Sequence, residues 1–579
     1  MRYLLAFVLL PIVSCVASYL NAHNFLLALF FLLGSCVFAV FSRLDTRLRD
    51  HLYPLLLTCV TLSLVLSATA ISSNLHGWDI QQEFSLFTQV FESGTWDANT
   101  NVLYNSALSI SILPSILSIV SRLEGITIFM FVMPMVFSIV PAVLYKIYRM
   151  ILAPDGAFLA VFLFMSYPSS YQEITELGRQ EIAEVILVLL LWLIVAGYTR
   201  IGGRLGLQPV LLLTFGLVVS HYSLAYIYTF VLASSILLAR FSRRAHGLVT
   251  LGASLLTAVI ALTWYLVVAG GASFNSLGVF ASYVVKGLLH DFLNPSTRPD
   301  IFLQAIGAKS ALPGLLHDLN RMVQSTVILV LLFGFIVFLF RGQKKTEEKV
   351  AFPIIVTGVI LLVSAAVLPF FAGGFNLSRF FHVSLLFASP CIVYGFSGLE
   401  QVLNRVRSLT HRESALSPHC SRGFRLSATT IVLLYFLFTS GWFWAVSMDR
   451  PTSLILDRER MLSYPDPMLR IEYYDGYTPL QDITAARFVR AHLRDSASLC
   501  AETRSRHQVL VSVGGVPEIG PELPSDCEFS TSYVYLSTLN SRYGEGLSWQ
   551  GTPWYVSEFA SNLAAKNRIY SDGGAILYE

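Results

Sequence analysis

The sequence predicts an α-helical polytopic membrane protein of about thirteen transmembrane helices with a small C-terminal extracytoplasmic α/β domain. Of the 579 residues, 55% are hydrophobic and only 13% are charged. The mean hydropathy of +0.63 exceeds that of soluble chains of this length. The net charge of +3 is nearly neutral, and the basic residues cluster between apolar stretches, so nucleic acid is not an expected partner.

Thirteen apolar stretches approach the roughly 20 residues that a membrane helix needs. They cover approximately residues 3–20, 25–41, 52–73, 125–145, 156–168, 181–198, 208–220, 222–239, 247–269, 323–340, 351–371, 380–399 and 427–447. The second stretch follows the first almost at once, which favours a retained first span over a cleaved secretory signal.

Basic residues occupy every second connection between these stretches. They are Arg43, Arg47, Arg49, Lys146, Arg149, Arg200, Arg204, Arg240, Arg243, Arg244, Arg341, Lys344, Lys345, Lys349, Arg405, Arg407, Arg412, Arg422 and Arg425. Because Lys and Arg mark cytoplasmic connections, we expect a multi-pass plasma-membrane protein with a cytoplasmic N-terminus. The outer loops are then 74–124, 167–180, 270–322 and 371–379, and the C-terminal segment is extracytoplasmic.

The two long outer loops contain apolar segments that are too short to cross the membrane. Residues 74–124 include LSISILPSILSIVSRL, in which Ser residues and Pro114 interrupt the apolar run, so we expect a helix lying at the interface. Residues 270–322 include FASYVVKGLLHDFL and LPGLLHDL. Such loops are typical of membrane enzymes that cover a lipid-fed site.

The composition changes at about residue 448, which divides the chain into a membrane domain, 1–447, and a mixed α/β domain, 448–579. TPLQDITAARFVRAHL predicts a helix in the second domain, and TSYVYLSTL and AILYE predict strands. Cys500 and Cys527 lie in this polar part, and the sequence leaves open whether they form a disulfide. No internal repeat is evident, which argues against a transporter built from two halves.

The segment HGWDIQQEF places two acids directly after the third apolar stretch. If this segment is helical, Asp79 and Glu83 are four positions apart and project from one face. Acids at a membrane boundary indicate function unless they are solvated or partnered. The alternative interpretation is a solvated helix start, with Trp78 as an interfacial anchor.

A second acidic segment, YPSSYQEITELGRQEIAEV, covers residues 167–185 on the next outer connection. At helical spacing Glu173, Glu176 and Gln180 share a face, as do Gln180 and Glu184. The alternative here is a polar helix start with acids near the positive end of the helix dipole.

Two acids from each segment form a candidate oxygen-ligand set for Mg²⁺ or Mn²⁺. The set is Asp79, Glu83, Glu173 and Glu176.

Candidate donor-binding residues lie at other outer helix ends. In FNLSRFFHVSLL, Arg379 offers a guanidinium suited to bidentate contact with phosphate oxygens; the alternative is a side chain that reaches the headgroup layer. Arg179, His221 and His382 join this candidate group, although a histidine at such a position is also explained as a hydrogen-bonded interface residue.

These residues fit one reaction. Transfer of a sugar from a lipid phosphate needs a carboxylate that takes the acceptor's proton and positive charge that stabilises the departing phosphate. Asp79 is the candidate general base. Arg379, together with a metal ion held through the acids at 173–176, is the candidate for leaving-group stabilisation.

The order of these features resembles the GT-C glycosyltransferases, which use polyprenyl-phosphate or polyprenyl-diphosphate sugar donors. The features are an acid-bearing first outer loop, an interfacial helix, a second acidic motif, an Arg before a late span and a C-terminal outer domain. The topology is similar to the oligosaccharyltransferase catalytic subunits, but their Trp-Trp-Asp motif is absent after residue 448. HGWDIQQEF, SHYSLAY and NLSRFFHVSLLF also resemble a poorly characterised group of predicted membrane proteins.

The resemblance implies an inverting transferase that acts on the extracytoplasmic face, with Asp79 as the first-loop acid and Glu173 or Glu176 in the second motif. That motif is Glu-x-x-Glu here rather than Asp-x-Asp. The implied partners are a polyprenyl-linked sugar donor, a glycan, lipid or protein acceptor, and membrane lipids. Three alternatives stay open: a polysaccharide polymerase or ligase that uses arginines, a flippase or transporter of lipid-linked sugars, and a scaffold for cell-envelope partners.

Overall fold

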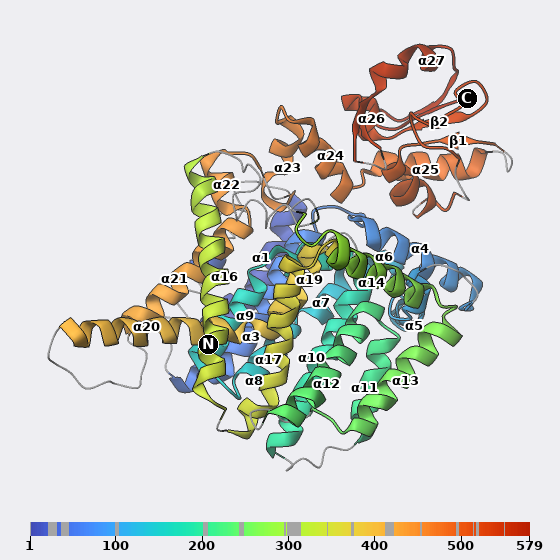
Figure 1. Ribbon diagram of the computed structural model, residues 1–579. Helices are drawn as coiled ribbons and strands as arrows, with labels where there is room; N and C mark the ends of the chain where they lie inside the picture. Colours follow the sequence, from blue (N-terminus) through green and yellow to red (C-terminus); the bar gives the residue numbers. More distant parts are fainter. Residues whose placement is uncertain are drawn as a thin grey trace.

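The computed structural model describes residues 2–20, 32–35, 46–98, 103–200, 207–242, 248–294, 297, 314–343, 345–371, 376–410, 422–451, 454–493, 497–512, 514–516, 520–548 and 551–579. A bundle of helices forms one part of the molecule, and a smaller region with strands lies at one end of it (Figure 1). The predicted fold class, a polytopic helical membrane protein with a small C-terminal α/β region, is confirmed. The predicted stretch 25–41 falls mostly outside the described residues.

Seven described helices or helix runs are long and apolar enough to cross a membrane, or eight if one bent pair is a single span, so the count of thirteen is not reproduced. Five of the seven lie within single helices: α3 (Thr46–Thr69), α10 (Gly178–Arg200), α12 (Tyr222–Phe241), α16 (Leu315–Arg341) and α17 (Thr346–Val367). The sixth is a continuous run of α6 (Gly125–Thr127), η2 (Ile128–Val132), α7 (Met133–Phe137) and α8 (Val140–Tyr148). The seventh combines α13 (Leu251–Leu262) with η5 (Thr263–Val268). Shorter apolar helices occupy four more predicted stretches: α1 (Arg2–Leu20), α9 (Pro154–Met165), α11 (Leu207–Val218) and α21 (Arg422–Thr439).

The predicted stretch 380–399 is not one straight helix. It divides into α19 (Leu377–Ala388) and α20 (Pro390–Thr410), which meet at 62°. The break lies at Pro390, whose missing N–H and ring prevent a continuous helix. Arg379 lies in α19, the first helix of this bent pair. The second helix, α20, runs in a different direction (Figure 1).

Buried apolar side chains from most of these helices form one large core. Polar contacts support it: the Ser14 hydroxyl donates to the Ser63 carbonyl (2.6 Å), and the Ser18 hydroxyl donates to the Ser67 carbonyl (2.7 Å). These bonds join α1 to α3. In an apolar environment such hydroxyls need partners within the protein.

The connecting segments 74–124, 167–180 and 270–322 supply several shorter helices. They are α4 (Trp78–Ser93), η1 (Leu103–Ser106), α5 (Ile112–Ser121), η3 (Pro168–Ser170), η4 (Glu173–Glu176) and α14 (Ala272–His290). In the predicted interfacial segment, α5 is short and exposes Ile116, Ile119 and Val120, as an interfacial helix does. The segment LPGLLHDL was predicted to be too short to cross the membrane. Its residues from Leu315 onward instead form the start of α16, which is one of the seven candidate spans.

The C-terminal region after α22 (Trp442–Ser447) mixes helices and strands. Its helical elements are α23 (Leu454–Ser463), α24 (Pro467–Gly476), α25 (Leu480–His492), η7 (Ser505–Val511), α26 (Thr538–Tyr543), η8 (Val556–Phe559) and α27 (Ala560–Ala564). The predicted helix in TPLQDITAARFVRAHL is α25, so that prediction is confirmed. The boundary at residues 447 and 448 stays a prediction.

Strands β1 (Leu499–Cys500), β2 (Tyr533–Leu536), β6 (Ile576–Tyr578) and β5 (Arg568–Ser571) form a sheet in the order β1-β2-β6-β5. Strand β1 is parallel to β2, and the other pairs are antiparallel. Strands β3 (Glu545–Leu547) and β4 (Pro553–Tyr555) form a separate antiparallel pair. Both predicted strands are confirmed as β2 and β6, and a Cys500–Cys527 disulfide ties β1 to a later loop.

Candidate active site

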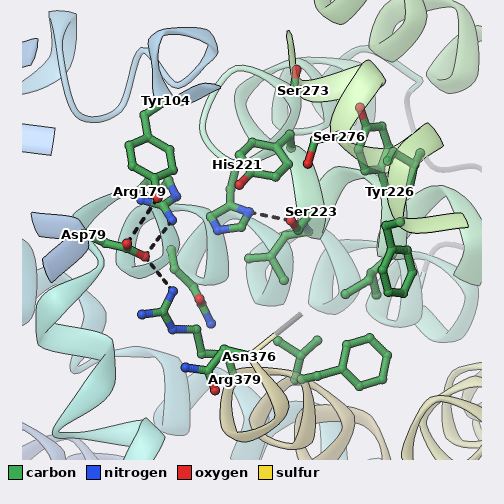
Figure 2. Close-up of a pocket in the computed structure, with 18 residues that line it drawn as sticks. Asp79, Tyr104, Arg179, His221, Ser223, Tyr226, Ser273, Ser276, Asn376 and Arg379 are labelled. Atoms are coloured by element: carbon green, nitrogen blue, oxygen red, sulfur yellow. Dashed lines mark hydrogen bonds and ion pairs between the residues drawn. The ribbon is translucent and has the colours of Figure 1, made fainter. Parts of the chain in front are cut away.

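A cavity of about 240 Å³ lies where the N-terminal ends of α10, α12 and α19 meet α4, η1 and α14. Figure 2 shows Asp79, Arg179 and Arg379 gathered on one side of it, with Tyr104 and His221 nearby. Serine and tyrosine side chains from α12 and α14 line the opposite side. The predicted convergence therefore occurs for Asp79 and Arg379. The predicted acids Glu83, Glu173 and Glu176 do not line this cavity.

Asp79 is the centre of the charged group. Its Oδ2 accepts hydrogen bonds from Arg379 Nη1 (2.6 Å) and from Arg179 Nη2 (3.1 Å). Its Oδ1 accepts from the Tyr104 hydroxyl (3.1 Å). Asp79 is buried, at 8% exposure, and two cations on one carboxylate oxygen make charge-assisted bonds of the strong kind.

Local structure places Asp79 in the first turn of α4. Gly77 precedes the helix with a φ of 99°, a conformation that favours glycine, and a Cβ there would overlap the Glu176 side chain. The chain therefore turns sharply into α4 against η4. An acid in the first turn also interacts favourably with the helix dipole.

Glu83 lies behind Asp79 and does not line the cavity. Its carboxylate pairs with the Arg179 guanidinium, and its Oε2 also accepts from the Arg179 backbone N–H (3.2 Å). The predicted i,i+4 face is confirmed, because both acids reach Arg179. Glu83 is fully buried, so its function in this arrangement is to fix Arg179 rather than to meet a ligand.

Arg179 was grouped with the donor-binding residues by sequence, and it lines the cavity. Its guanidinium carbon lies 4.1 Å from the centre of the Tyr104 ring, a cation–π distance. It is 3% exposed. The ring and the two acids together hold the guanidinium in one position.

His382 does not line the cavity. Its Nε2 lies 2.9 Å from Glu184 Oε1, and its Nδ1 lies 3.0 Å from the Ser170 hydroxyl oxygen. Glu184 also accepts from Gln180 Nε2 (2.8 Å), which confirms that Gln180 and Glu184 share a face. We therefore correct the assignment of His382 to donor contact: it is fully buried in a hydrogen-bonded chain that leads to Gln180, which does line the cavity.

His221 lines the cavity and caps α12, where its Nδ1 accepts from the Leu224 backbone N–H (3.3 Å). Burial lowers the pKa of His221 well below its usual value, and the charges of Arg179 and Arg379 lower it further. His221 is therefore a neutral side chain at physiological pH.

The second acidic motif is arranged differently from the prediction. Glu173 and Glu176 belong to the 3-10 turn η4, and Leu177 has non-helical angles (φ −141°, ψ 68°) before α10 begins at Gly178. The predicted continuous face from Glu173 to Gln180 is therefore wrong, because the helix does not include both ends. Glu173 instead accepts from the Ser378 hydroxyl (2.5 Å).

The acids outside the membrane spans differ in their tendency to ionise. Burial raises the pKa of Asp79, but the charges and hydrogen bonds of Arg179 and Arg379 outweigh it, so the net pKa is below the usual value. Burial raises the pKa of Glu83 to about 7. Burial and then the neighbouring Glu173 raise the pKa of Glu176 to about 8. Asp79 is thus ionised at neutral pH, and Glu176 is largely protonated.

The predicted metal ligands do not fit a divalent cation. The part of the chain that the structure describes contains no group of three or more His, Cys, Asp or Glu side chains able to share a metal ion. Asp79 and Glu83 bind Arg179 between them, where a cation would meet the guanidinium charge. Glu173 points its carboxylate to Ser378. Asp79, Glu83, Glu173 and Glu176 therefore do not form one ligand group in this arrangement.

Several cavity residues escaped sequence reasoning. Tyr104 contacts both Asp79 and Arg179, and Asn376 caps α19 beside Arg379 by accepting from the Ser378 backbone N–H (3.0 Å). Tyr104 lies in a polar stretch with no helical or strand period. Asn376 was detectable, because Asn just before an apolar helix is a typical N-cap.

The C-terminal region approaches the site through η7, which packs against α4. The His507 ring lies 5.6 Å from the ring of Trp78, the residue next to Asp79. Asp475 in α24 accepts from Gln508 Nε2 (3.3 Å). The C-terminal region therefore contacts the helix that carries Asp79.

Comparisons with known proteins support the membrane interpretation. The model of the family described as "Predicted membrane protein (DUF2206)" matches residues 209–578, more than half of the chain. No curated protein matches the sequence.

Solved structures resemble the chain in fold. Archaeal oligosaccharyltransferase AglB from Archaeoglobus fulgidus, in complex with an inhibitory peptide and a dolichol-phosphate, has a TM-score of 0.50 at 13% identity, over 87% of this chain and 74% of that chain. The likeness is one of fold, and at that level the similarity to oligosaccharyltransferase catalytic subunits inferred from the sequence is confirmed.

Two further structures show weaker likeness. The Archaeoglobus fulgidus oligosaccharyltransferase in complex with Zn and sulfate has a TM-score of 0.48 at 12% identity, over 87% of this chain and 72% of that chain. ArnT from Cupriavidus metallidurans bound to undecaprenyl phosphate has a TM-score of 0.44 at 10% identity, over 90% of this chain and 97% of that chain.

Proposed function

The chain belongs to the DUF2206 family of membrane proteins, and we propose that it is a glycosyltransferase that moves a sugar from a polyprenyl-linked phosphate donor to an acceptor on the extracytoplasmic face. One observation carries the proposal: a buried carboxylate, Asp79, and two guanidiniums, Arg179 and Arg379, meet at the wall of one cavity. The GT-C fold agrees with this chemistry.

The roles follow from charge. Arg379 and Arg179 bind the donor phosphate, because guanidiniums make bidentate contacts with phosphate oxygens. Asp79 accepts the proton of the acceptor hydroxyl. Asp79 is a weak base while both arginines contact it, but a phosphate that draws Arg379 away removes a stabilising charge and raises the basicity of Asp79.

The reaction is a single displacement. The acceptor oxygen attacks C1 of the sugar from the side opposite to the phosphate, and the bond between C1 and the phosphate oxygen breaks with its electron pair left on that oxygen. The hydroxyl proton passes to Asp79. The product is a glycoside of inverted configuration, and the polyprenyl phosphate leaves while the arginines hold its new charge.

The proposed orientation places the C-terminal region outside the cytoplasm. The Cys500–Cys527 disulfide supports it, because disulfides persist in oxidising compartments. The contact between Trp78 and His507 keeps that region beside the cavity. An acceptor glycan, lipid or protein then enters from the aqueous side, and the donor enters from the membrane.

The test is transfer by the purified full chain in detergent. Labelled polyprenyl phosphate and polyprenyl diphosphate derivatives of several sugars are supplied with a cell-envelope extract as acceptor. We expect labelled sugar to leave at least one donor. If every donor stays intact while the protein moves a lipid-linked sugar across a proteoliposome membrane, the protein is a transporter and the proposal is wrong.

A second candidate, a polysaccharide polymerase or ligase, is favoured by the presence of two arginines in the cavity wall. The two candidates differ in the product. A polymerase extends a chain or moves a preformed one, and the glycosyltransferase adds one sugar unit to each acceptor. Mass spectrometry of the labelled product distinguishes them.

A further inference from the structure

We propose that Glu184 and His382 are a positioning pair for the candidate active site. They join α10 to α19 and so hold the two cavity arginines, Arg179 and Arg379, against one oxygen of Asp79. This inference rests on the proposed function for what the two arginines bind. Neither member of the pair lines the cavity, and both are fully buried. The pair therefore acts through its neighbours and not by contact with a ligand.

The pair directly connects the two helices that carry the arginines. His382 Nε2 lies 2.9 Å from Glu184 Oε1 and 3.0 Å from Oε2. Arg379 comes about one helical turn before His382 on α19, and Arg179 comes between one and two turns before Glu184 on α10. Figure 2 shows both guanidiniums directed at the Asp79 carboxylate. A shift of either helix at the pair would move an arginine relative to that carboxylate.

Helix α19 needs such a contact because it is short and bends by 62° into α20. A long straight span therefore does not fix its N-terminal end, and side chains do so instead. The Ser378 hydroxyl donates to Glu173 (2.5 Å), and His382 Nδ1 lies 3.0 Å from the Ser170 hydroxyl oxygen. Both partners precede α10 in the chain, so α19 is attached to the segment that leads into Arg179.

The pair also orients Gln180, which lines the cavity next to Arg179. Gln180 Nε2 donates to Glu184 Oε1 (2.8 Å). A carboxylate has no proton to donate, so the amide nitrogen must face Glu184 and the amide oxygen is the atom left for the cavity. His382 holds the carboxylate from its other side. The same pair thus determines that Gln180 presents a hydrogen-bond acceptor in the cavity wall.

A neighbouring acid on the same helix shows that this pairing is specific. Glu181 is also fully buried in the first turn of α10, yet neither of its oxygens has a hydrogen-bond partner among the described residues. Burial of an acid in α10 is therefore not by itself accompanied by a histidine. Glu184 differs from Glu181 in that its partner belongs to the helix of Arg379.

The first experiment measures the accessibility of Arg379 in the purified full chain in detergent. Phenylglyoxal modifies accessible guanidiniums, and mass spectrometry of proteolytic peptides gives the rate at each arginine. The Arg379 side chain is 26% exposed and is held by Asp79. We expect Glu184→Gln and His382→Leu each to raise its modification rate by about threefold or more, because local opening exposes the guanidinium. An unchanged rate in both variants overturns the proposal.

Two other arginines show whether the effect is local. Arg321 on α16 has a side chain that is 36% exposed, so its rate should be the same in every variant. Arg504 in the C-terminal region is buried and should stay protected. A rise at Arg504 that equals the rise at Arg379 would show a general loss of structure and contradict the proposal.

Two matched variants separate hydrogen bonding from packing. Glu181→Gln makes the same chemical change as Glu184→Gln at the same depth in α10, and it should leave the Arg379 rate unchanged. His382→Gln keeps an N–H near the position of Nε2, so it should bring the rate to within about twofold of the wild type. Equal effects of the two glutamate variants, or of His382→Gln and His382→Leu, would show that the pair has no specific role.

A second experiment separates this inference from the proposed function. With a donor that the wild-type chain consumes, Glu184→Gln should lower kcat/KM by about tenfold or more, because misplaced catalytic groups are costly, and Glu181→Gln should not. A wild-type chain that consumes no donor contradicts the transferase function, and the phenylglyoxal rates then decide on the pair without any donor. Transfer by the wild type together with an unchanged Arg379 rate in Glu184→Gln and His382→Leu overturns this inference and leaves the transferase function intact.

Discussion

Arg379 Nη1 lies 2.6 Å from Asp79 Oδ2, although the two residues are 300 positions apart in the chain. Asp79 comes from the first outer loop and Arg379 from the first turn of α19. The intervening Arg179, at the start of α10, binds the same oxygen. The fold therefore assembles the candidate site from the N-terminal ends of α4, α10 and α19.

Asp79→Asn is expected to abolish sugar transfer. The amide keeps the shape of the carboxylate but cannot take a proton, and loss of a general base costs roughly 10²–10⁴-fold in rate. Initial rates with a verified donor provide the measurement, and comparable expression and size-exclusion profiles show that the variant folds. Asp318→Asn, at the exposed outer turn of α16, is the control. Full activity of Asp79→Asn would exclude Asp79 as the base.

Tyr104→Phe is expected to reduce kcat with little change in the KM for the donor. The Tyr104 hydroxyl donates to Asp79 Oδ1 (3.1 Å), whereas the arginines contact the other oxygen. Loss of one hydrogen bond to a charged group corresponds to about 1.5–3 kcal/mol, roughly tenfold or more in rate. Steady-state kinetics separate the two parameters. An increase in KM alone would show that Tyr104 contacts the donor and does not orient Asp79.

Glu176 is expected to produce an alkaline limit on activity. Its pKa is raised to about 8, mainly by burial, so the side chain is neutral below pH 8 and negative above it. The charge of Arg379 affects Glu176, and an ionised Glu176 would compete with the donor phosphate for that arginine. Transfer is therefore expected to fall as the pH rises through about 8.

Glu176→Gln is expected to flatten this alkaline limb because it cannot ionise. Glu124→Gln, at an exposed position before α6, is the control and should keep the wild-type profile. Rate measurements across the pH range provide the test. An unchanged alkaline limb in Glu176→Gln would assign the limit to another group.

Gly77→Ala is expected to impair both stability and transfer more than Gly94→Ala. Gly94 is in the left-handed helical region, where alanine costs about 1–2 kcal/mol of strain. Gly77, with φ 99° and ψ 162°, is in a region that is essentially confined to glycine, so alanine is more strained there. A Cβ at Gly77 also overlaps Glu176, whereas a Cβ at Gly94 meets nothing within 4 Å. Thermal unfolding in detergent and initial rates provide the comparison. Equal effects at the two positions would show that the overlap is relieved without moving Asp79.

Local patterns predicted much of the membrane part. Apolar length located helices in twelve of the thirteen stretches, and the remaining one lies mostly outside the described residues. The pairing of Gln180 with Glu184 followed from helical spacing. These features depend on residues within one or two helical turns, which the sequence records directly.

Other features depend on contacts between distant segments. Nothing near Glu83 in the sequence indicates that Arg179 would occupy the space between it and Asp79, so a metal ion was predicted where the structure has a guanidinium. His382 was predicted to bind the donor because it lies near the end of a predicted helix. Its contact with Glu184 depends on how α19 packs against α10, which the local sequence does not indicate. The non-helical Leu177 likewise depends on tertiary context.

The neighbouring positions of Trp78 and Asp79, with His507 beside the indole ring, have a practical consequence. Indole emission responds to the polarity and ring contacts around it, so this side chain is a native optical probe of the junction. Replacing the other seven tryptophans would let ligand entry be followed in real time without any attached dye.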